Sequence, residues 1–383
     1  MRVDIAQITP STPPTAIAHH SDDVLVSVVL DRRQEWWRRR ICALALSGRV
    51  PAGYVPALLD VVRDSRVTTE IRVALLEILP LSDELLTWLR TAADDALALA
   101  IIRTRARFGD TTVVPDLVRL MESEWHHRRM VAEQGIDMLG ERAVLDALGF
   151  DSALSLMLFG DTPATRVLGV RWADPDITQA LADEERMVAR EAYDRLADVS
   201  DNHGELFRMV VDRAPGHLWA LAVLAARGEP IDDQWAALGR PRVDVPGLPA
   251  DVRAAIVRQY VPGTRETDPR WMLEAACLPA PEPEDVLTEA LAALAPFTPA
   301  TPVTAGDHHQ QGEGTYHVVD TAAGRVMVST LGRFYWADNI PDLPGFRRID
   351  DTLGAIVVTG LPVYFFGHRE PLTVHDLVFY WQD

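Results

Sequence analysis

Lysine is absent from the sequence, and all 37 basic residues among the 383 are arginine. Without lysine the chain cannot form the Schiff base of pyridoxal-phosphate chemistry, and it lacks the lysine of a Walker phosphate loop. Both classes of enzyme are therefore excluded. A GC-rich coding genome, which favours arginine codons, accounts for the composition. The alternative is a surface that escapes lysine-directed conjugation.

Cysteine and long apolar runs are also scarce. Cys42 and Cys277 lie far apart, and two cysteines provide neither a disulfide framework nor a cysteine-based zinc site. No window approaches the ~18 uninterrupted apolar residues of a membrane span. The segment 1–14 has one arginine and no apolar core, unlike a secretory signal. We therefore expect a cytoplasmic protein that makes no membrane contact.

Catalytic and metal-binding motifs are lacking too. The pairs His19-His20, His126-His127 and His308-His309 are adjacent residues, which on a helix point about 100° apart, and no His-x-x-x-His spacing occurs. The sequence contains no Gly-x-Ser-x-Gly elbow and no Gly-x-Gly-x-x-Gly loop. It thus predicts no catalytic residue, no metal site and no cofactor.

The composition is that of an acidic globular protein. The formal net charge is −19 and 48% of the residues are hydrophobic, and the length allows two or three domains. Strong negative charge disfavours nucleic acid as a partner, because neutralisation of phosphates dominates such binding. The arginines could gather on one face, so charge alone leaves that class open.

Pairs of short amphipathic helices recur from about residue 35 to residue 295. One helix of each pair carries an arginine before small and branched apolar residues, as in 40–46, 72–79 and 129–132, with a period of roughly thirty residues. The partner helix 54–62 has one apolar stripe of Leu58, Leu59 and Val62. Neither helix can bury its stripe alone, so the pairs must stack on one another.

The Val-Arg-x-x-Ala cadence of these copies resembles a HEAT-type repeat, of the short-helix variety that is similar to the repeats of phycobilisome lyases. The resemblance covers about two-thirds of the chain and implies an α-solenoid of about eight helical pairs with a concave binding surface. It also implies that the recurring arginine pairs with an aspartate of the preceding repeat. It implies no single chemistry.

The C-terminal part differs in kind. A linker rich in Pro, Gly, His and Gln is expected over 296–314, after which a period near two predicts strands at 315–320, 325–330, 332–336, 355–359, 362–366 and 377–381. The expected fold is therefore mainly α. An N-terminal segment with a lead-in helix spans 1–34, a HEAT-like α-solenoid spans 35–295, and a small antiparallel β domain spans 315–383.

Trp36-Trp37, followed by three arginines that include Arg39 and Arg40, is the most unusual local cluster. Adjacent helix positions allow only one of the two indoles to face the core, which leaves the other near the surface within reach of Arg39 or Arg40. This pattern favours a helix that caps the solenoid core, and a binding site at Trp36, Trp37, Arg39 and Arg40 is the alternative that we retain. HEAT-like alkylpurine glycosylases resemble the architecture and use Trp and Asp, for which Trp172 and Asp174 are the nearest match.

The sequence favours a scaffold or adaptor that binds a protein or peptide on its concave face. A solenoid has no deep catalytic pocket by default, and no catalytic set of residues stands out. An enzyme built on a HEAT frame, either tailoring or lyase-like or nucleic-acid glycosylase-like, stays open as the alternative.

Overall fold

The computed structural model describes residues 2–173, 177–199, 202–264, 266–279, 285–297, 300–302, 314–340, 342–363 and 371–380. Over these residues the chain is mainly helical, and its strands lie in the C-terminal part. It forms two compact units, Met1–Asp151 (unit 1) and Ser152–Asp383 (unit 2). The boundary lies inside the segment 35–295, which the sequence pattern treats as one continuous array.

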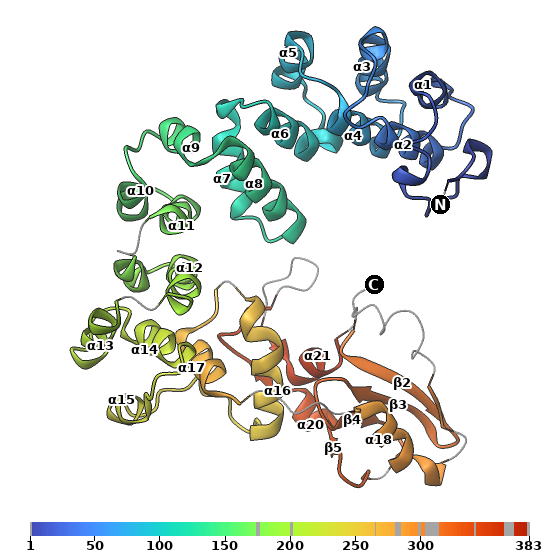
Figure 1. Cartoon of the computed structure of the whole chain (residues 1–383). Helices are drawn as coiled ribbons and strands as arrows, with labels where there is room; N and C mark the ends of the chain where they lie inside the picture. The colour runs from blue at the N-terminus through green and yellow to red at the C-terminus, as the bar shows by residue number, and fades with distance from the viewer. Residues whose placement is uncertain are drawn as a thin grey trace. The chain divides into compact units, whose positions relative to one another are not determined.

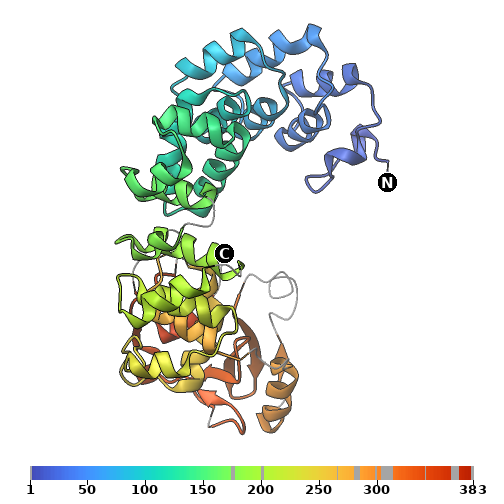
Figure 2. The ribbon, with the colours of Figure 1, turned by 60° about the vertical axis from the view of Figure 1, so that its left-hand side comes forward.

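Unit 1 is built from paired helices. They are α1 (Asp22–Leu30), α2 (Trp36–Ala45), α3 (Val55–Arg63), α4 (Thr69–Ile78), α5 (Asp83–Thr91), α6 (Ala98–Arg107), α7 (Val114–Met121), α8 (His126–Leu139) and α9 (Glu141–Leu148). From α1 to α8 each odd-numbered helix packs on the next, and α2, α4, α6 and α8 also contact one another in series. Figure 1 shows α1, α3 and α5 on the outer side of an arc with α2, α4 and α6 on its inner side, and Figure 2 shows the same blue-to-green arc turned.

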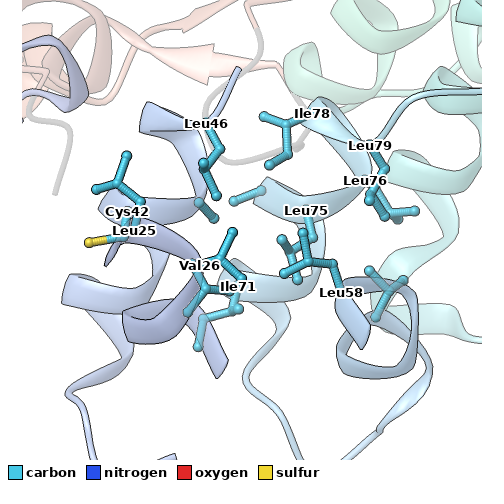
Figure 3. Close-up of a cluster of buried hydrophobic side chains, with 14 of the residues drawn as sticks. Leu25, Val26, Cys42, Leu46, Leu58, Ile71, Leu75, Leu76, Ile78 and Leu79 are labelled. Carbon is cyan, nitrogen blue, oxygen red and sulfur yellow. The ribbon is translucent and has the colours of Figure 1, made fainter. Parts of the chain in front are cut away.

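The core of unit 1 explains why the helices pair. The predicted stripe of Leu58, Leu59 and Val62 on α3 is buried. Side chains from α1 to α4 converge in one cluster, in which Leu25, Leu58 and Leu75 are fully enclosed (Figure 3). Burial of each such leucine stabilises the folded state by about 1.5–3 kcal/mol, which a single short helix in water could not obtain.

Two arginines join successive helices in the same way: Arg72, which the repeat pattern identifies, and Arg39, which takes the place expected for Arg40. Nε of Arg39 donates to the carbonyl oxygen of Val29 (2.8 Å), and Nε of Arg72 donates to that of Val62 (2.7 Å). Each acceptor lies in the last turn of the preceding helix, where carbonyl groups lack intrahelical partners. Nη2 of Arg72 pairs with Asp94 (2.5 Å), which follows it by 22 residues. The resemblance implied an aspartate of the preceding repeat. For Arg72 that expectation is wrong, because the preceding helix supplies a carbonyl group.

Unit 2 begins with further helical pairs. Its helices are α10 (Ala153–Phe159), α11 (Pro163–Trp172), the 3-10 helix η6 (Thr178–Ala182), α12 (Arg186–Ala197), α13 (His203–Val211), α14 (His217–Ala226), α15 (Asp232–Ala237), α16 (Ala250–Tyr260), α17 (Pro269–Cys277), α18 (Val286–Ala293), α20 (Asp351–Gly354) and α21 (Val374–Val378). Here α11, α12, α14 and α17 contact one another in series. Unit 2 therefore repeats the packing pattern of unit 1.

The strands of unit 2 form two sheets. The first has the order β1 (Thr301–Pro302), β2 (Tyr316–Thr321), β3 (Gly324–Ser329), β4 (Phe334–Ala337) and β5 (Arg347–Arg348), and the second pairs β6 (Val357–Val358) with β7 (Leu372–Thr373). The strands β1 to β4 are antiparallel, but β4 and β5 are parallel. The expected antiparallel sheet is therefore a mixed one.

The predicted strand at 377–381 is wrong over the residues described there. Leu377 and Val378 lie in α21, which begins after a capping box of Thr373 and Asp376. This local hydrogen bonding outweighs the β propensity of the apolar run that follows it. Of the predicted strand at 362–366, residues 364–366 lie outside the described part.

The helical and β portions of unit 2 share a core. Val286 and Ala290 of α18, expected in the solenoid, are buried in a cluster with Val326 and Tyr335 of the sheet. Strand β1 lies in the segment expected as a linker, and its Thr301 pairs with Asp320 of β2. Residues 303–313 of that segment lie outside the described part. The sheet therefore packs against α18 in one common core.

Candidate functional site

The Trp–Arg cluster opens α2 in unit 1. Trp36 is 45% exposed, whereas Trp37 is half-buried against the core of the unit. The guanidinium carbon of Arg38 lies 5.1 Å from the centroid of the Trp37 ring, so the cation nearest an indole is Arg38 and not the expected Arg39 or Arg40. The adjacent positions thus separate one core-facing tryptophan from one surface tryptophan.

Arg39 and Arg40 have different environments. Arg39 is only 6% exposed, and apart from its bond to Val29 its Nη2 is buried without a hydrogen-bond partner among the described residues. Burial lowers the pKa of this guanidinium, and the positive charge of Arg32 lowers it further. Arg39 therefore binds the end of α1 inside the core of unit 1. Arg40 is exposed, four residues after Trp36, and shares its stripe of the helix.

The exposed and half-buried residues of α2, α4, α6 and α8 form a surface that we call the inner face. Since Arg39 and Arg72 make equivalent contacts, Arg40 is equivalent to half-buried Val73. Arg103 of α6 pairs with Glu77 of α4 across this face (3.2 Å), and both side chains are partly exposed. The inner face includes Trp36, Arg40, Glu70, Val73, Glu77, Arg103, Met130 and Met138, together with the exposed His126, His127, Asp137 and the exposed cations Arg107 and Arg128. It combines both signs of charge with apolar side chains.

The second pair suggested by the sequence, Trp172 and Asp174, belongs to unit 2. Trp172 is the last residue of α11 in unit 2 and is half-buried, and the neighbouring Arg171 binds Glu191 of α12 (2.9 Å). Asp174 lies outside the described residues. Of the predicted site residues, the structure therefore places Trp36, Trp37, Arg39 and Arg40 on one helix and Trp172 in the other unit.

A buried cationic centre on α12 went unrecognised in the sequence. Arg190 is almost enclosed, and its Nη1 donates to the carbonyl oxygen of Thr264 (2.5 Å) while its Nη2 donates to that of Pro262 (2.9 Å). Nε donates to the carboxylate of Asp194 (3.0 Å). Both residues line a cavity of about 250 Å³. Because all three nitrogens are engaged, Arg190 ties α12 to the turn that follows α16.

A larger cavity, of about 1080 Å³, lies elsewhere in unit 2. One wall is a single stripe of α16 at helical spacing, made of Asp251, Ala254, Ala255, Arg258 and Gln259. The other lining residues come from the ends of α17 and α18 and from the β3–β4 loop. No sequence signal identified this cavity, because its walls come from separate segments of the chain.

Other chemistry is not evident in the described part of the chain. No group of three or more His, Cys, Asp or Glu side chains there is arranged to hold a metal ion. None of the helices described is both long enough and apolar enough to cross a bilayer.

Comparison with known proteins identifies no relative. The HEAT-type resemblance therefore depends on the repeat pattern alone. The chain matches no protein-family model, no curated protein and no solved structure.

Proposed function

We propose that the protein is a cytoplasmic helical-repeat adaptor of HEAT-like type, an α-solenoid that binds a protein or peptide along the inner face of unit 1. The serial packing of α2, α4, α6 and α8 supports this proposal, because it leaves one exposed strip on each of these helices. The observation that carries it is the exposure of Trp36, Met130 and Met138 on that face, with exposed fractions of 42–45%.

These side chains suit recognition of a peptide. Tryptophan is enriched among residues that dominate binding energy, and methionine adapts its shape to different partners. Arg40 and Glu70 are exposed at the same surface and can pair with charges of either sign, which fixes the register of a bound chain. A phosphate backbone would instead need a run of cations without intervening carboxylates.

Selection of peptides against the full chain tests this proposal. A random twelve-residue peptide library would be selected on the immobilised protein, and the enriched peptides measured by isothermal titration calorimetry. We expect Trp36→Ala and the double variant Met130→Ala with Met138→Ala each to weaken binding by about 2 kcal/mol, the scale of a dominant interface residue. The melting temperature should change little, because these side chains are partly exposed.

Val24→Ala is the matched control, since Val24 is an equally exposed apolar residue of α1, on the outer side of the arc. It should leave peptide affinity unchanged. Failure to enrich any peptide, or equal affinity in the wild type and both inner-face variants, would reject the proposal. A lower melting temperature with intact binding in Trp36→Ala would instead show that Trp36 only caps the repeat core.

A further inference from the structure

The large cavity of unit 2 has mostly apolar walls. Ala254 and Ala255 face it from α16, Leu278 from the end of α17, and Leu331 and Phe334 from the β3–β4 region. Its volume of about 1080 Å³ is slightly above the range typical of small-molecule pockets, about 300–1,000 Å³. An apolar molecule in this cavity would remove these walls from water.

Arg258 is the only cation among the described residues that line the cavity. Its side chain is half-buried, and Nε is covered without a hydrogen-bond partner. Among the described residues Arg258 makes no ion pair, in contrast to Arg253 one turn earlier, which binds Glu274 through Nε and Nη2. A covered N–H group without an acceptor is costly, so an anion that binds this guanidinium would stabilise it.

Asp251, the one acidic residue of the described lining, does not neutralise the charge of Arg258. Asp251 stands two helical turns before Arg258 and accepts a hydrogen bond from Nε of Arg347 (2.6 Å). Its charge is therefore compensated by Arg347. The cavity wall keeps the positive charge of Arg258 beside apolar side chains.

We propose that this cavity binds a small molecule that carries a carboxylate on an apolar body. The carboxylate pairs with the guanidinium of Arg258, whose planar fork matches its two oxygens, and the apolar body lies against Ala254, Leu278 and Phe334. This site belongs to unit 2 and is independent of the peptide surface proposed for unit 1, so either proposal can fail alone.

Calorimetric titration of the full chain tests the site. The probes are decanoate and 4-phenylbutanoate, both below the concentrations at which they form micelles, and decyltrimethylammonium is the cationic control with the same chain length as decanoate. We expect saturable binding of at least one carboxylate and at least tenfold weaker binding of the cation. Arg258→Gln should weaken carboxylate binding at least tenfold, and Ala254→Trp, which fills the cavity without removing the cation, should do the same.

Arg325→Gln is the matched control, because it removes the same charge from an exposed arginine of β3 that pairs with Asp320 outside the cavity. It should bind the carboxylate as the wild type does, and circular dichroism should show that all three variants are folded. The proposal is overturned if neither carboxylate binds saturably, if the cation binds as tightly, or if Arg258→Gln and Ala254→Trp both leave affinity unchanged.

Discussion

At the scale of single residues, the absence of lysine has a structural counterpart. Arginine side chains make more than one hydrogen bond to carbonyl groups at helix ends. Nη2 of Arg107 donates to the carbonyl oxygens of Leu76 and Leu79 (both 3.0 Å), and Nε and Nη2 of Arg227 both donate to that of Leu196. A guanidinium presents five donors in a rigid plane, whereas an ammonium is a compact point charge. These positions therefore require arginine whether or not genome composition explains the missing lysine.

Arg72→Lys tests that requirement. Arg72 is buried and uses Nε for Val62 and Nη2 for Asp94, and one ammonium cannot reach both with the same geometry. We expect the free energy of unfolding to fall by about 2 kcal/mol, since one buried acceptor loses its donor. Urea unfolding followed by circular dichroism measures it. The control Arg119→Lys changes an exposed arginine and should cost less than about 0.5 kcal/mol. Equal stability of Arg72→Lys and wild type would contradict the argument.

At the scale of helices, one carboxylate connects three elements of unit 1. The buried side chain of Asp110 accepts hydrogen bonds from Arg90 at the end of α5, from Arg105 of α6, and from Thr112 in the turn before α7. Burial alone would raise its pKa, but the hydrogen bonds from Arg90, Thr112 and Arg105 outweigh burial and hold the pKa well below the usual range.

This arrangement predicts acid-sensitive stability in unit 1. A carboxyl group with a lowered pKa in the folded state stabilises the fold above its unfolded pKa of about 3.9, and that contribution is lost as the pH falls towards the folded value. We expect Asp110→Asn to lower the free energy of unfolding by roughly 3 kcal/mol at pH 7, because two arginines lose their shared counter-ion.

Urea unfolding of wild type and Asp110→Asn at pH 7, 5 and 3 measures the effect. The difference between the two proteins should be nearly constant from pH 7 to 5 and should shrink at pH 3. Asp146→Asn is the control, because its partner Arg142 is exposed on the same helix, and its effect should be small at every pH. A difference for Asp110→Asn that does not depend on pH would contradict the assigned role of its charge.

The elements also show which features a sequence can predict. The stripe of α3 and the separation of Trp36 from Trp37 follow from helical spacing, which is local. The hydrogen bonds of Arg190 to residues more than 70 positions away, and the walls of the Arg258 cavity, depend on chain folding that no local pattern records. The parallel pairing of β4 and β5 joins Phe334 to Arg347 for the same reason.

At the scale of the whole molecule, the two compact units do not coincide with the helical and β portions of the chain. In a stacked array each repeat contacts mainly its two neighbours. The array can therefore end wherever the interface between two repeats is weak. The structure divides the chain after Asp151, within the helical portion. It also joins α18 to the sheet through the core of Val286, Ala290 and Leu294. A cut after residue 300 would therefore pass through a packed core, whereas a cut after residue 151 would leave each compact unit whole.

Fragments 1–151 and 1–300 distinguish these two divisions. We expect 1–151 to be folded and to keep Cys42 unreactive towards a thiol reagent, because the side chain is buried and burial raises the pKa of the thiol to about 11. Since Cys277 is absent from this fragment, Cys42 alone reports on the fold, and it should react fully in guanidinium chloride. Fragment 1–300 keeps α18 but lacks Val319, Val326 and Tyr335, which cover it, and should bind a hydrophobic dye more strongly than the whole chain. Rapid labelling of Cys42 in 1–151, together with a fully folded 1–300 that binds no dye, would place the boundary at the end of the helical array instead.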